Sequence, residues 1–582
     1  MTQGRLRTGT SDEELLRDAD VPSFVAGLHA GRVRWDLIHP FPEQDPEDRL
    51  IGDRAVAEMT GLLRERIDPI TAEADRRLPD GLVDVLRTSG LLKLGAPREL
   101  GGHDLSPYNV FRTLCAALSW SAAVGQTLSV DNSVGVGAYL PALPAGPLRD
   151  WVRERVAASV VSCTADTEPI GAHNKERRTV AVPTGDGSAY LLTGEKIFVA
   201  NAPIADVIVT TATLGDQLRL FFVDAHDPGV QVKARHDFVG LAGFPNGNLR
   251  YDAVRVPRER MLPEERHDGR LTPTTTRMVV RGRMYLVVAP SLAFARLAVH
   301  CARDFARRRS IDGRPLAGYD EVQRQVAESL ADTFAIAALA EWCLLAERSR
   351  PANPLYEQLA AKNIASVACG RVVDRTMSLF GAEGLETAAS KARRGAVPLP
   401  VERVYRDARV MRINGGVDFQ LDNWAGQYLL ASHYSPPDGA AAAPVDLASL
   451  PGVRLSARNL AHADRVVTDA ARLAQTCRDL VRRYPDSAAL FERERVVILL
   501  SLVLNELLAM ALVLARAASL DAAAGLADVY CTAAADRLDD WWRRLAAADE
   551  TSGADHAAVT DHWLHGDALE FLTADLVPPV AR

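Results

Sequence analysis

Cysteine is scarce in this sequence: seven cysteines are scattered over 582 residues, and no C-x-x-C pair occurs. The sequence therefore indicates neither a disulfide framework nor a zinc site. No other metal site is expected, because His562 and His565 have acidic neighbours but no further ligand at a typical spacing. The N-terminal arginines are not followed by the apolar segment that a secretory signal needs. These absences favour a reduced, cytoplasmic enzyme of several domains.

An excess of positive charge is missing as well. The formal net charge is −8 at pH 7, whereas proteins that bind nucleic acid usually carry a basic excess, so no nucleic-acid partner is expected. Aromatic residues make up only 6% of the chain. The sequence has no G-x-S-x-G elbow and no Walker loop, and Gly135-Val136-Gly137 lacks the third glycine of a dinucleotide-binding fingerprint. The sequence therefore gives no indication of an α/β-hydrolase, a P-loop NTPase or a dinucleotide-binding domain.

One long apolar run, residues 496–515, is about as long as a membrane-spanning helix. Asn505 and Glu506 lie at its middle, where a polar or ionisable group is costly in lipid. Amphipathic helical patterns flank the run on both sides. We therefore predict a buried helix inside a helical domain, and membrane binding is not expected.

The order of hydrophobic patterns predicts an α+β chain that is mostly α. Residues 1–45 show no clear period and are predicted to form an extension. Apolar residues recur at spacings of three and four over residues 46–159, which predicts a helical domain. Short β-branched runs separated by turn signals fill residues 160–270 and predict an antiparallel β-domain. Helical periodicity returns over residues 271–434 and, after a proline- and alanine-rich linker, over residues 447–582.

Two segments of the predicted β-domain carry small hydroxyl and aromatic residues. They are residues 164–169 (TADTEP) and residues 194–201 (GEKIFVAN). A flat redox-active ring needs backbone donors, small hydroxyls and an aromatic wall beside it. The two segments can supply these groups only if they lie side by side in the folded chain.

These segments resemble the β-domain of acyl-CoA dehydrogenases and acyl-CoA oxidases, in which a TEP-type and a GxKxxITN-type strand bracket the flavin of FAD. The resemblance covers about residues 50–430 and continues in the family's order. Its further parts are VRVP (254–257), Arg309 with GRPL (313–316) and Gln323, LFGAEG (379–384), YRDAR (405–409) and INGG (413–416). The resemblance implies an N-terminal helical domain, a middle β-domain and a C-terminal four-helix bundle. The additional C-terminal helical domain resembles that of very-long-chain dehydrogenases and oxidases.

The resemblance also implies an FAD cofactor and a set of residues that contact it. The residues implied to line the flavin are Thr164, Thr167, Phe198 and Ala200. Those implied to contact the rest of FAD are Arg309, Ser378, Gly381, Gly384 and Gln420. In the family, the arginine and the two glycines approach the pyrophosphate of a neighbouring subunit, so the resemblance implies a homodimer.

The family's catalytic base is absent from this sequence. The glutamate of the family's I-x-E-G motif is replaced by Gly415, and the alternative position for a base is Gly282, between Arg281 and Arg283. A positioned base typically contributes about 10²–10⁴-fold to the rate. Gly415 keeps its backbone N–H, which in the family holds the substrate carbonyl oxygen, so stabilisation of an oxyanion can survive without the base.

Four hypotheses account for the missing glutamate. In the first, which we prefer, the enolate of an acyl thioester or β-keto acid forms by decarboxylation. Arg281 or Arg283 binds the carboxylate that is to be lost, His173 contacts the substrate, and oxygenation to an epoxyketone can follow. In the second, Asp418 replaces the base of an ordinary dehydrogenase acting on acyl-CoA or an acyl carrier protein. The third is a flavin monooxygenase with a partner reductase, and the fourth is a non-catalytic scaffold. The altered site favours a role in specialised metabolism.

Overall fold

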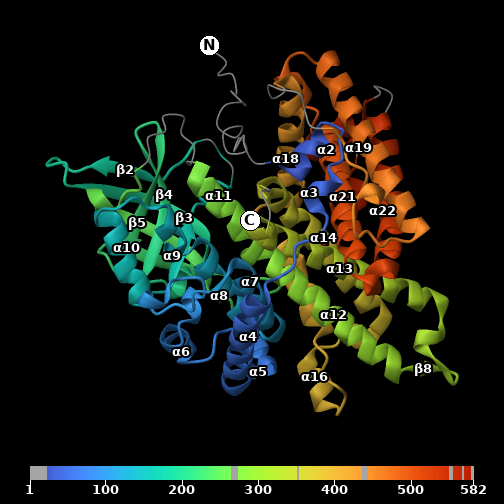
Figure 1. Cartoon of the computed structure of the whole chain (residues 1–582). Helices are drawn as coiled ribbons and strands as arrows, with labels where there is room; N and C mark the ends of the chain where they lie inside the picture. Colours follow the sequence, from blue (N-terminus) through green and yellow to red (C-terminus); the bar gives the residue numbers. More distant parts are fainter. Residues whose placement is uncertain are drawn as a thin grey trace.

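Helices dominate the chain, and a β-domain interrupts them (Figure 1). The computed structural model describes residues 22–172, 174, 176–263, 273–349, 353–435, 443–549, 555–566 and 569–577. Within these ranges the elements follow the predicted order of helical, β, helical and again helical regions. The predicted fold class, α+β and mostly α, is confirmed.

The first helical region surrounds one almost fully buried helix, α8. Its helices are α4 (Pro46–Arg66), α5 (Pro69–Asp75), α6 (Leu82–Thr88), α7 (Pro107–Trp120), α8 (Ala122–Val134), α9 (Val136–Tyr139) and α10 (Pro147–Ala157). Two of them begin where local chemistry dictates. Asp45 and Ser106 accept hydrogen bonds from the free N–H groups of the first turns of α4 and α7, and each helix has proline at its first position.

The β-domain is a seven-stranded sheet. Its strands are β1 (Ser162–Ala165), β2 (Val180–Pro183), β3 (Ala189–Ala200), β4 (Val207–Leu214), β5 (Gln217–Asp224), β6 (Val230–Arg235) and β7 (Asn246–Pro257). The expectation of a purely antiparallel sheet is wrong in one respect: β1 runs parallel to β4 over four residue pairs, and β2 meets β4 in parallel at one pair. The reason is topological. The chain reverses direction between β2 and β3 and again between β3 and β4, so β4 runs in the same direction as β1 and β2.

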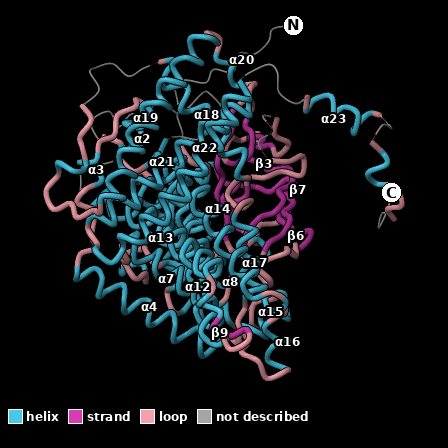
Figure 2. Tube along the Cα trace, turned by 90° about the vertical axis from the view of Figure 1, so that its right-hand side faces the viewer, coloured by secondary structure: helices cyan, strands magenta, loops and turns pink. Residues whose placement is uncertain are grey.

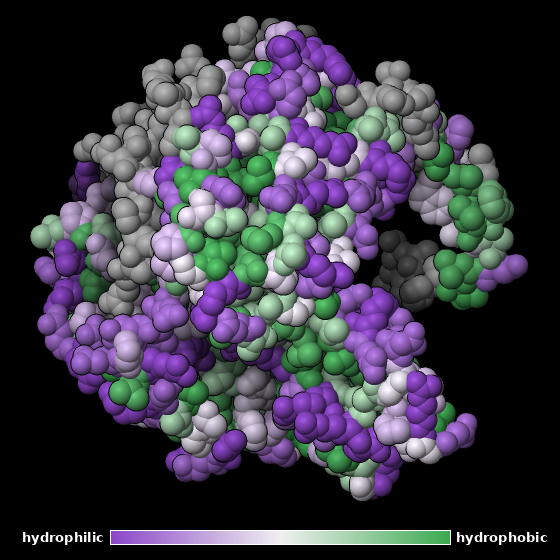
Figure 3. All heavy atoms as spheres, turned by 45° about the vertical axis from the view of Figure 1, so that its right-hand side comes forward, coloured by the Kyte–Doolittle hydropathy of each residue, from purple (hydrophilic) through white to green (hydrophobic). Residues whose placement is uncertain are grey.

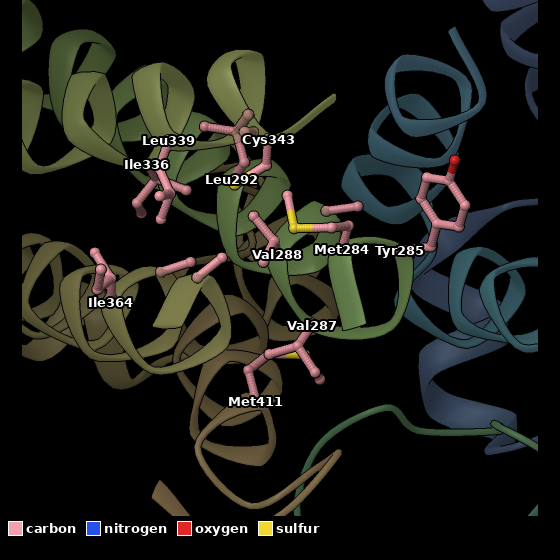
Figure 4. Packing of buried hydrophobic residues seen from close by; sticks show 14 of the residues in the cluster. Met284, Tyr285, Val287, Val288, Leu292, Ile336, Leu339, Cys343, Ile364 and Met411 are labelled. Carbon is pink, nitrogen blue, oxygen red and sulfur yellow. The ribbon is translucent and has the colours of Figure 1, made fainter. Parts of the chain in front are cut away.

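The second helical region is built on α12, which continues from α11 through a π-helical turn. Its main elements are α11 (Pro273–Arg283), η6 (Met284–Val288), α12 (Ala289–Arg308), α13 (Asp320–Ser349), α14 (Leu355–Phe380), α17 (Val401–Met411) and α18 (Asp418–Tyr434). Two short strands, β8 (Ser310–Ile311) and β9 (Arg314–Pro315), follow α12, and two short helices, α15 (Ala382–Leu385) and α16 (Ala388–Arg393), follow α14. Figure 4 shows Met284 and Val288 in the packed interior, Val287 beside Met411 of α17, and Tyr285 pointing away from them. The π-turn thus lies inside the core.

The C-terminal region packs three long helices against this bundle. They are α19 (Ala457–Arg483), α21 (Glu494–Ala518) and α22 (Ala524–Asp549), with α20 (Ser487–Phe491) and α23 (His556–His565) as shorter helices. Among the described residues, three stretches (277–308, 320–346 and 494–518) are long and apolar enough to cross a membrane, and 89% of the apolar window of α21 is buried inside the molecule. Both polar residues at its middle have partners: Asn505 donates to Asp422 at 2.9 Å, and Glu506 pairs with Arg537 at 2.6 Å. The predicted buried helix is confirmed.

The N-terminal residues do not form a loose extension where they are described. The short helices α2 (Phe24–His29) and α3 (Trp35–Ile38) lie against the C-terminal helices α19 and α21. Phe24 and Trp35 are only 1% exposed. Val25, Leu28 and Ile38 are buried as well, so apolar side chains of both short helices attach this segment.

Candidate active site

The two segments singled out in the β-domain lie side by side, as the sequence prediction required. The Ile197 N–H donates to the Thr167 carbonyl at 2.9 Å. Next to this contact, the Lys196 ammonium lies 3.0 Å from the Glu168 carboxylate, and the two side chains are 0% and 1% exposed. Burial raises the pKa of Glu168, but the Arg178 N–H and the Lys196 ammonium outweigh that effect and hold the pKa below its usual value. This buried ion pair, which sequence reasoning missed, joins the segments.

Phe198 forms part of an exposed aromatic surface at the end of β3. Its φ is +58° and its side chain is 56% exposed. The rings of His236 and Phe238 lie 5.1 Å and 6.3 Å from it, and the His236 ring nitrogen Nε2 is 2.6 Å from the Asn248 amide oxygen. A bulky aromatic residue with positive φ is uncommon, and here it coincides with a shift of register between β3 and β7. The surface can serve as one wall for a flat ring.

The other predicted flavin residues lie at the junction of β1, β3 and the helical domain. The Thr164 hydroxyl donates to the Val134 carbonyl at 2.6 Å, which leaves its lone pairs available as acceptors. Thr167 and Ala200 are half-buried, and Ala200 has no hydroxyl to offer a ring. His173 lies outside the described residues.

Asp131 fixes this junction from the end of α8. Its carboxylate accepts from the Ser162 N–H at 2.9 Å and the Ser162 hydroxyl at 2.7 Å, and the Asn201 amide lies 3.3 Å away. Three donors, from β1 and from the residue after β3, therefore converge on one helical side chain. Sequence reasoning missed Asp131, although a buried-helix pattern containing a carboxylate was the available signal.

Gly415 lies in a loop between α17 and α18 whose backbone suits glycine. Its φ is +70°, and that of Gly416 is +114°. A Cβ atom at position 415 would lie 3.2 Å from Cγ2 of Val287, so a glutamate would meet both backbone strain and a close contact. Within the described part of the chain, the Gly415 N–H has no acceptor. It therefore remains available to a substrate oxygen.

The π-turn η6 positions this loop. The Leu286 carbonyl accepts from the Asn414 amide at 3.3 Å and from the Gln126 amide of α8 at 3.2 Å. A π-turn offers such a carbonyl to side chains because it interrupts the regular hydrogen bonding of the helix. The turn therefore connects α8, α12 and the residue next to Gly415.

Arg283 lies against Gly415 at the last position of α11. A Cβ atom on Gly415 would be 3.9 Å from Cγ of Arg283. Among the described residues, the half-buried Arg283 forms no ion pair or hydrogen bond through its side chain, and burial lowers the pKa of its guanidinium. Arg281 is exposed and has interactions elsewhere. Of the two predicted carboxylate-binding residues, Arg283 is the one that adjoins the empty base position.

The alternative base position is equally crowded. A Cβ atom on Gly282 would lie 3.2 Å from Cγ1 of Val134 and 3.3 Å from the Ser133 carbonyl. A side chain there would have to displace the end of α8, so both positions favour glycine for steric reasons.

Asp418 serves the loop rather than facing a substrate. Its carboxylate accepts from the Arg412 guanidinium at 2.6 Å and from the Phe419 N–H at 2.9 Å. Its own carbonyl accepts from the Asn363 amide at 2.8 Å. Arg412 binds one carboxylate oxygen and the Phe419 N–H the other, so Asp418 is anchored in the loop, and this geometry disfavours the hypothesis that Asp418 is the base.

The YRDAR motif attaches the β-domain to α17. The buried Asp407 carboxylate accepts from the Leu241 N–H at 2.6 Å, in the loop after β6. Burial raises the pKa of Asp407 to about 6. The motif therefore acts structurally, holding the loop after β6 against the helix that leads to Gly415.

Lys362 of α14 lies beneath the Gly415 loop and donates to the Arg412 carbonyl at 3.0 Å. Burial, opposed by Asp418 and assisted by Arg283, lowers the pKa of Lys362 to about 8. Because an unfolded lysine titrates near about 10.4, the unfolded chain binds more protons between these values. Stability from this group is therefore fully present above the unfolded pKa and lost as pH falls through about 8.

Lys362→Met is expected to remove this pH dependence. The difference in unfolding free energy between wild type and variant should change by on the order of 2 kcal/mol between about pH 7.5 and 10, in favour of the wild type at high pH. Urea unfolding at both pH values measures it, and other titrating groups cancel in the difference. Parallel pH profiles would contradict the assignment.

The residues predicted to contact the rest of FAD are spread along the bundle. Arg309 is exposed just beyond α12, 26 residues from Arg283 along almost continuous helix, or about 39 Å at ~1.5 Å per residue. Gly381 has φ +57° and open space around a would-be Cβ, whereas Gly384 packs against the Met377 carbonyl. Ser378 is exposed and Gln420 half-buried. One chain does not bring Arg309 to Gly415.

Comparison with known proteins gives a consistent result. Residues 163–254 match the middle domain of acyl-CoA dehydrogenases, and residues 274–422 match their C-terminal domain. Probable acyl-CoA dehydrogenase FadE10 of Mycobacterium tuberculosis is 30% identical over 407 residues, 68% of this chain and 61% of that protein. The chain thus spans about three fifths of the length of that relative. The mitochondrial short-chain specific acyl-CoA dehydrogenase of Homo sapiens is 27% identical over 60% of this chain and 82% of its own.

A solved structure shares the fold over most of both chains. The acyl-CoA dehydrogenase from Bacillus anthracis complexed with FAD superposes with a TM-score of 0.73, over 92% of this chain and 93% of that chain. The sequences are 17% identical in that comparison. The likeness therefore extends to the C-terminal helical region as well as the bundle and the β-domain.

Proposed function

The chain belongs to the acyl-CoA dehydrogenase superfamily, and from this premise we propose that it is an FAD-dependent oxidoreductase whose substrate enolate forms by decarboxylation. The substrate class is an acyl thioester or β-keto acid that carries a carboxylate at the reacting carbon. The observation that carries the proposal is Arg283, whose Cγ lies 3.9 Å from where a Cβ of residue 415 would be and whose side chain has no ion-pair partner among the described residues. The stem of a basic side chain thus adjoins the position where the family places an anionic base.

The residues present fit FAD in most respects. Phe198 with His236 and Phe238 offers an exposed aromatic wall, and the Thr167 carbonyl contacts the residue before Phe198. Ala200 offers no hydroxyl, so backbone groups of this strand would have to make the polar contacts there. When bound, FAD supplies an acceptor for the hydride that leaves the substrate's β-carbon.

Arg283 and Gly415 have separate roles in the proposed reaction. The guanidinium orients the carboxylate through two charge-assisted hydrogen bonds. The bond between the α-carbon and the carboxylate breaks, carbon dioxide leaves, and the electron pair moves onto the carbonyl oxygen. The Gly415 N–H donates to this oxygen, where negative charge develops, and so acts on the transition state rather than on binding alone. Loss of hydride from the β-carbon then leaves an α,β-unsaturated product, and no base is required.

The proposal includes a homodimer. Arg309 cannot reach Gly415 of its own chain across about 39 Å of helix, yet it is exposed and has no ion-pair partner among the described residues. A second copy would bring its Arg309 and Gly381 toward the phosphates of the cofactor bound near this Gly415. The substrate is an acyl group on CoA or on a carrier protein, or a free β-keto acid, and the absent base supports a role in specialised metabolism.

The experiment compares two thioesters that differ only in an α-carboxylate. Purified yellow protein is mixed anaerobically with each, without NAD(P)H, while flavin absorbance and carbon dioxide are followed. Bleaching with stoichiometric carbon dioxide from the carboxylated substrate alone is the expected result. Bleaching with the plain acyl thioester would mean that a base operates, and the decarboxylative proposal would fail. Turnover that needs a flavin reductase and oxygen, without bleaching, would replace it with a monooxygenase, and oxygen added after bleaching tests epoxide formation.

A further inference from the structure

The C-terminal segment, residues 555–577, has an apolar surface that the described part of its own chain leaves uncovered. Almost every described residue of the segment is exposed. Its large apolar side chains are between 47% and 87% exposed: Val559, Trp563, Leu564, Phe571, Leu572, Leu576 and Val577. Figure 2 shows α23 and the C-terminus standing apart from the rest of the molecule, and Figure 3 shows apolar atoms on a protrusion separated from the body by a gap. An uncovered apolar segment of this size marks an interaction site.

The segment is also acidic. Residues 555–577 contain four aspartates and one glutamate and neither lysine nor arginine. On α23, Val559 and Trp563 share one face because they are four residues apart, and Leu564 follows directly. A partner surface that fits this segment therefore combines an apolar floor with positive charge.

Such a surface exists between α12 and α13. A groove of about 440 Å³ runs between the two helices. Its rim is formed by Arg296, Arg303 and Arg307 with His300 between them, which recur at the spacing of one helical face, and its apolar floor by Val299, Val322, Val326 and Leu330. The three arginines and His300 are exposed, and Leu330 is 42% exposed.

The arginines at the end of α12, Arg303 and Arg307, have no carboxylate beside them in the groove as far as the structure describes it. In the part of the chain that the structure describes, no aspartate or glutamate lines it. Among the same residues, Arg303 and Arg307 form no ion pair, whereas the next residue, Arg308, is paired with Asp304 and Glu383. The groove and the C-terminal segment are thus complementary in charge and in apolar character.

We propose that the C-terminal segment of one copy of this chain docks in the α12–α13 groove of a second copy. The apolar side chains of Trp563 and Leu564 cover the floor at Leu330, and the segment's carboxylates meet the arginine rim. A single aromatic side chain such as that of Trp563 can bury on the order of 150–250 Å² at such a contact. The interface is reciprocal, since each copy supplies one segment and one groove.

The α12–α13 groove of the same chain is poorly placed to receive the C-terminal segment. His556, the first residue of α23, contacts Arg495 on the first turn of α21 at 3.2 Å. α13 approaches α21 near Glu506, because Arg537, the partner of Glu506, interacts with Asp332 of α13. Glu506 is 11 residues beyond Arg495, or about 17 Å along the helix. In Figure 2, α23 stands clear of α12 and α13. A second copy can meet the segment where it stands.

Disulfide trapping tests the contact directly. The seven native cysteines are all buried, so an introduced surface thiol reacts selectively. Full-length Leu564→Cys chain is mixed with Leu330→Cys chain carrying a mass tag, and the mixture is oxidised gently. The expected result is a mixed disulfide dimer, at least about tenfold more abundant than when Leu520→Cys, an apolar residue that is 41% exposed elsewhere, replaces Leu330→Cys.

A charge variant and a single-chain variant complete the test. Arg303→Glu with Arg307→Glu in the tagged chain should lower the mixed dimer at least about tenfold, whereas the matched Arg98→Glu on another surface should not change it. Raising the salt concentration should weaken trapping in the unmodified groove. A chain with both Leu564→Cys and Leu330→Cys that forms only an intramolecular disulfide would overturn docking between copies. Absence of either disulfide would overturn the groove as the docking site.

Discussion

Replacing Arg283 with methionine is expected to lower kcat/KM for an α-carboxylated thioester by about 10²–10³-fold. Removing one partner of a buried, hydrogen-bonded charge pair costs on the order of 3–4 kcal/mol, which corresponds to that factor. Most of the loss should appear in KM, because the guanidinium holds the carboxylate in the bound state as well as during bond breaking. Steady-state kinetics with the carboxylated thioester measures the change.

The same thioester without its carboxylate provides the internal control. Its binding, followed by the perturbation of the flavin spectrum, should be the same in wild type and Arg283→Met. Arg283→Lys should recover only part of the loss, since lysine keeps the charge but not the paired geometry of the guanidinium. Arg281→Met, on the exposed side of the same helix, should have little effect. Equal losses for both thioesters would assign Arg283 to the fold rather than to the carboxylate.

Replacing Glu168 with alanine is expected to destabilise the protein by about 3–5 kcal/mol, because it strands a buried ammonium. Lys196 would keep only the Asp166 carbonyl and the Thr211 hydroxyl as acceptors. The N–H groups of Arg178 and Thr179, which donate to Glu168 at 2.6 Å and 3.1 Å, would lose theirs as well. The free energy of unfolding, from urea denaturation followed by circular dichroism, measures the effect.

A second lysine–glutamate pair on the same sheet serves as the control, because it has the same charges but is exposed. Lys233 and Glu195 lie 2.8 Å apart, but their side chains are 42% and 36% exposed. Glu195→Ala should therefore cost no more than about 1 kcal/mol. If both alanine variants lost the same stability, the Lys196–Glu168 pair would not be the buried link between the two segments that the structure indicates.

Local patterns in the sequence were sufficient for the order of domains and for most elements. The helical spacing of apolar residues predicted α21, including its burial, because Asn505 and Glu506 made a lipid environment unfavourable. The neighbouring placement of residues 164–169 and 194–201 was also predictable, since both had to serve one ring. Periodicity reports which face of an element is apolar, and that information is local.

Other features depended on contacts between distant parts of the chain. The partners of Glu506 and Asn505 come from α22 and α18, and no spacing in the sequence pairs them. The parallel contact of β1 with β4 joins strands that are separated along the chain by two others. The N-terminal helices α2 and α3 are held by buried apolar side chains that include Leu28 and Ile38, and helices of six and four residues are too short to show a repeating pattern.

The sequence by itself determined the superfamily, the mostly helical architecture and the absence of a glutamate at position 415. Only the tertiary structure decided that Arg283 lies beside Gly415 with no ion-pair partner among the described residues, and that Arg412 holds Asp418. The physical reason is that residue types and their spacing are properties of the chain, whereas an unsatisfied charge is a property of the space around it. That space is formed by α11, the π-turn and the α17–α18 loop, which come together only when the bundle closes.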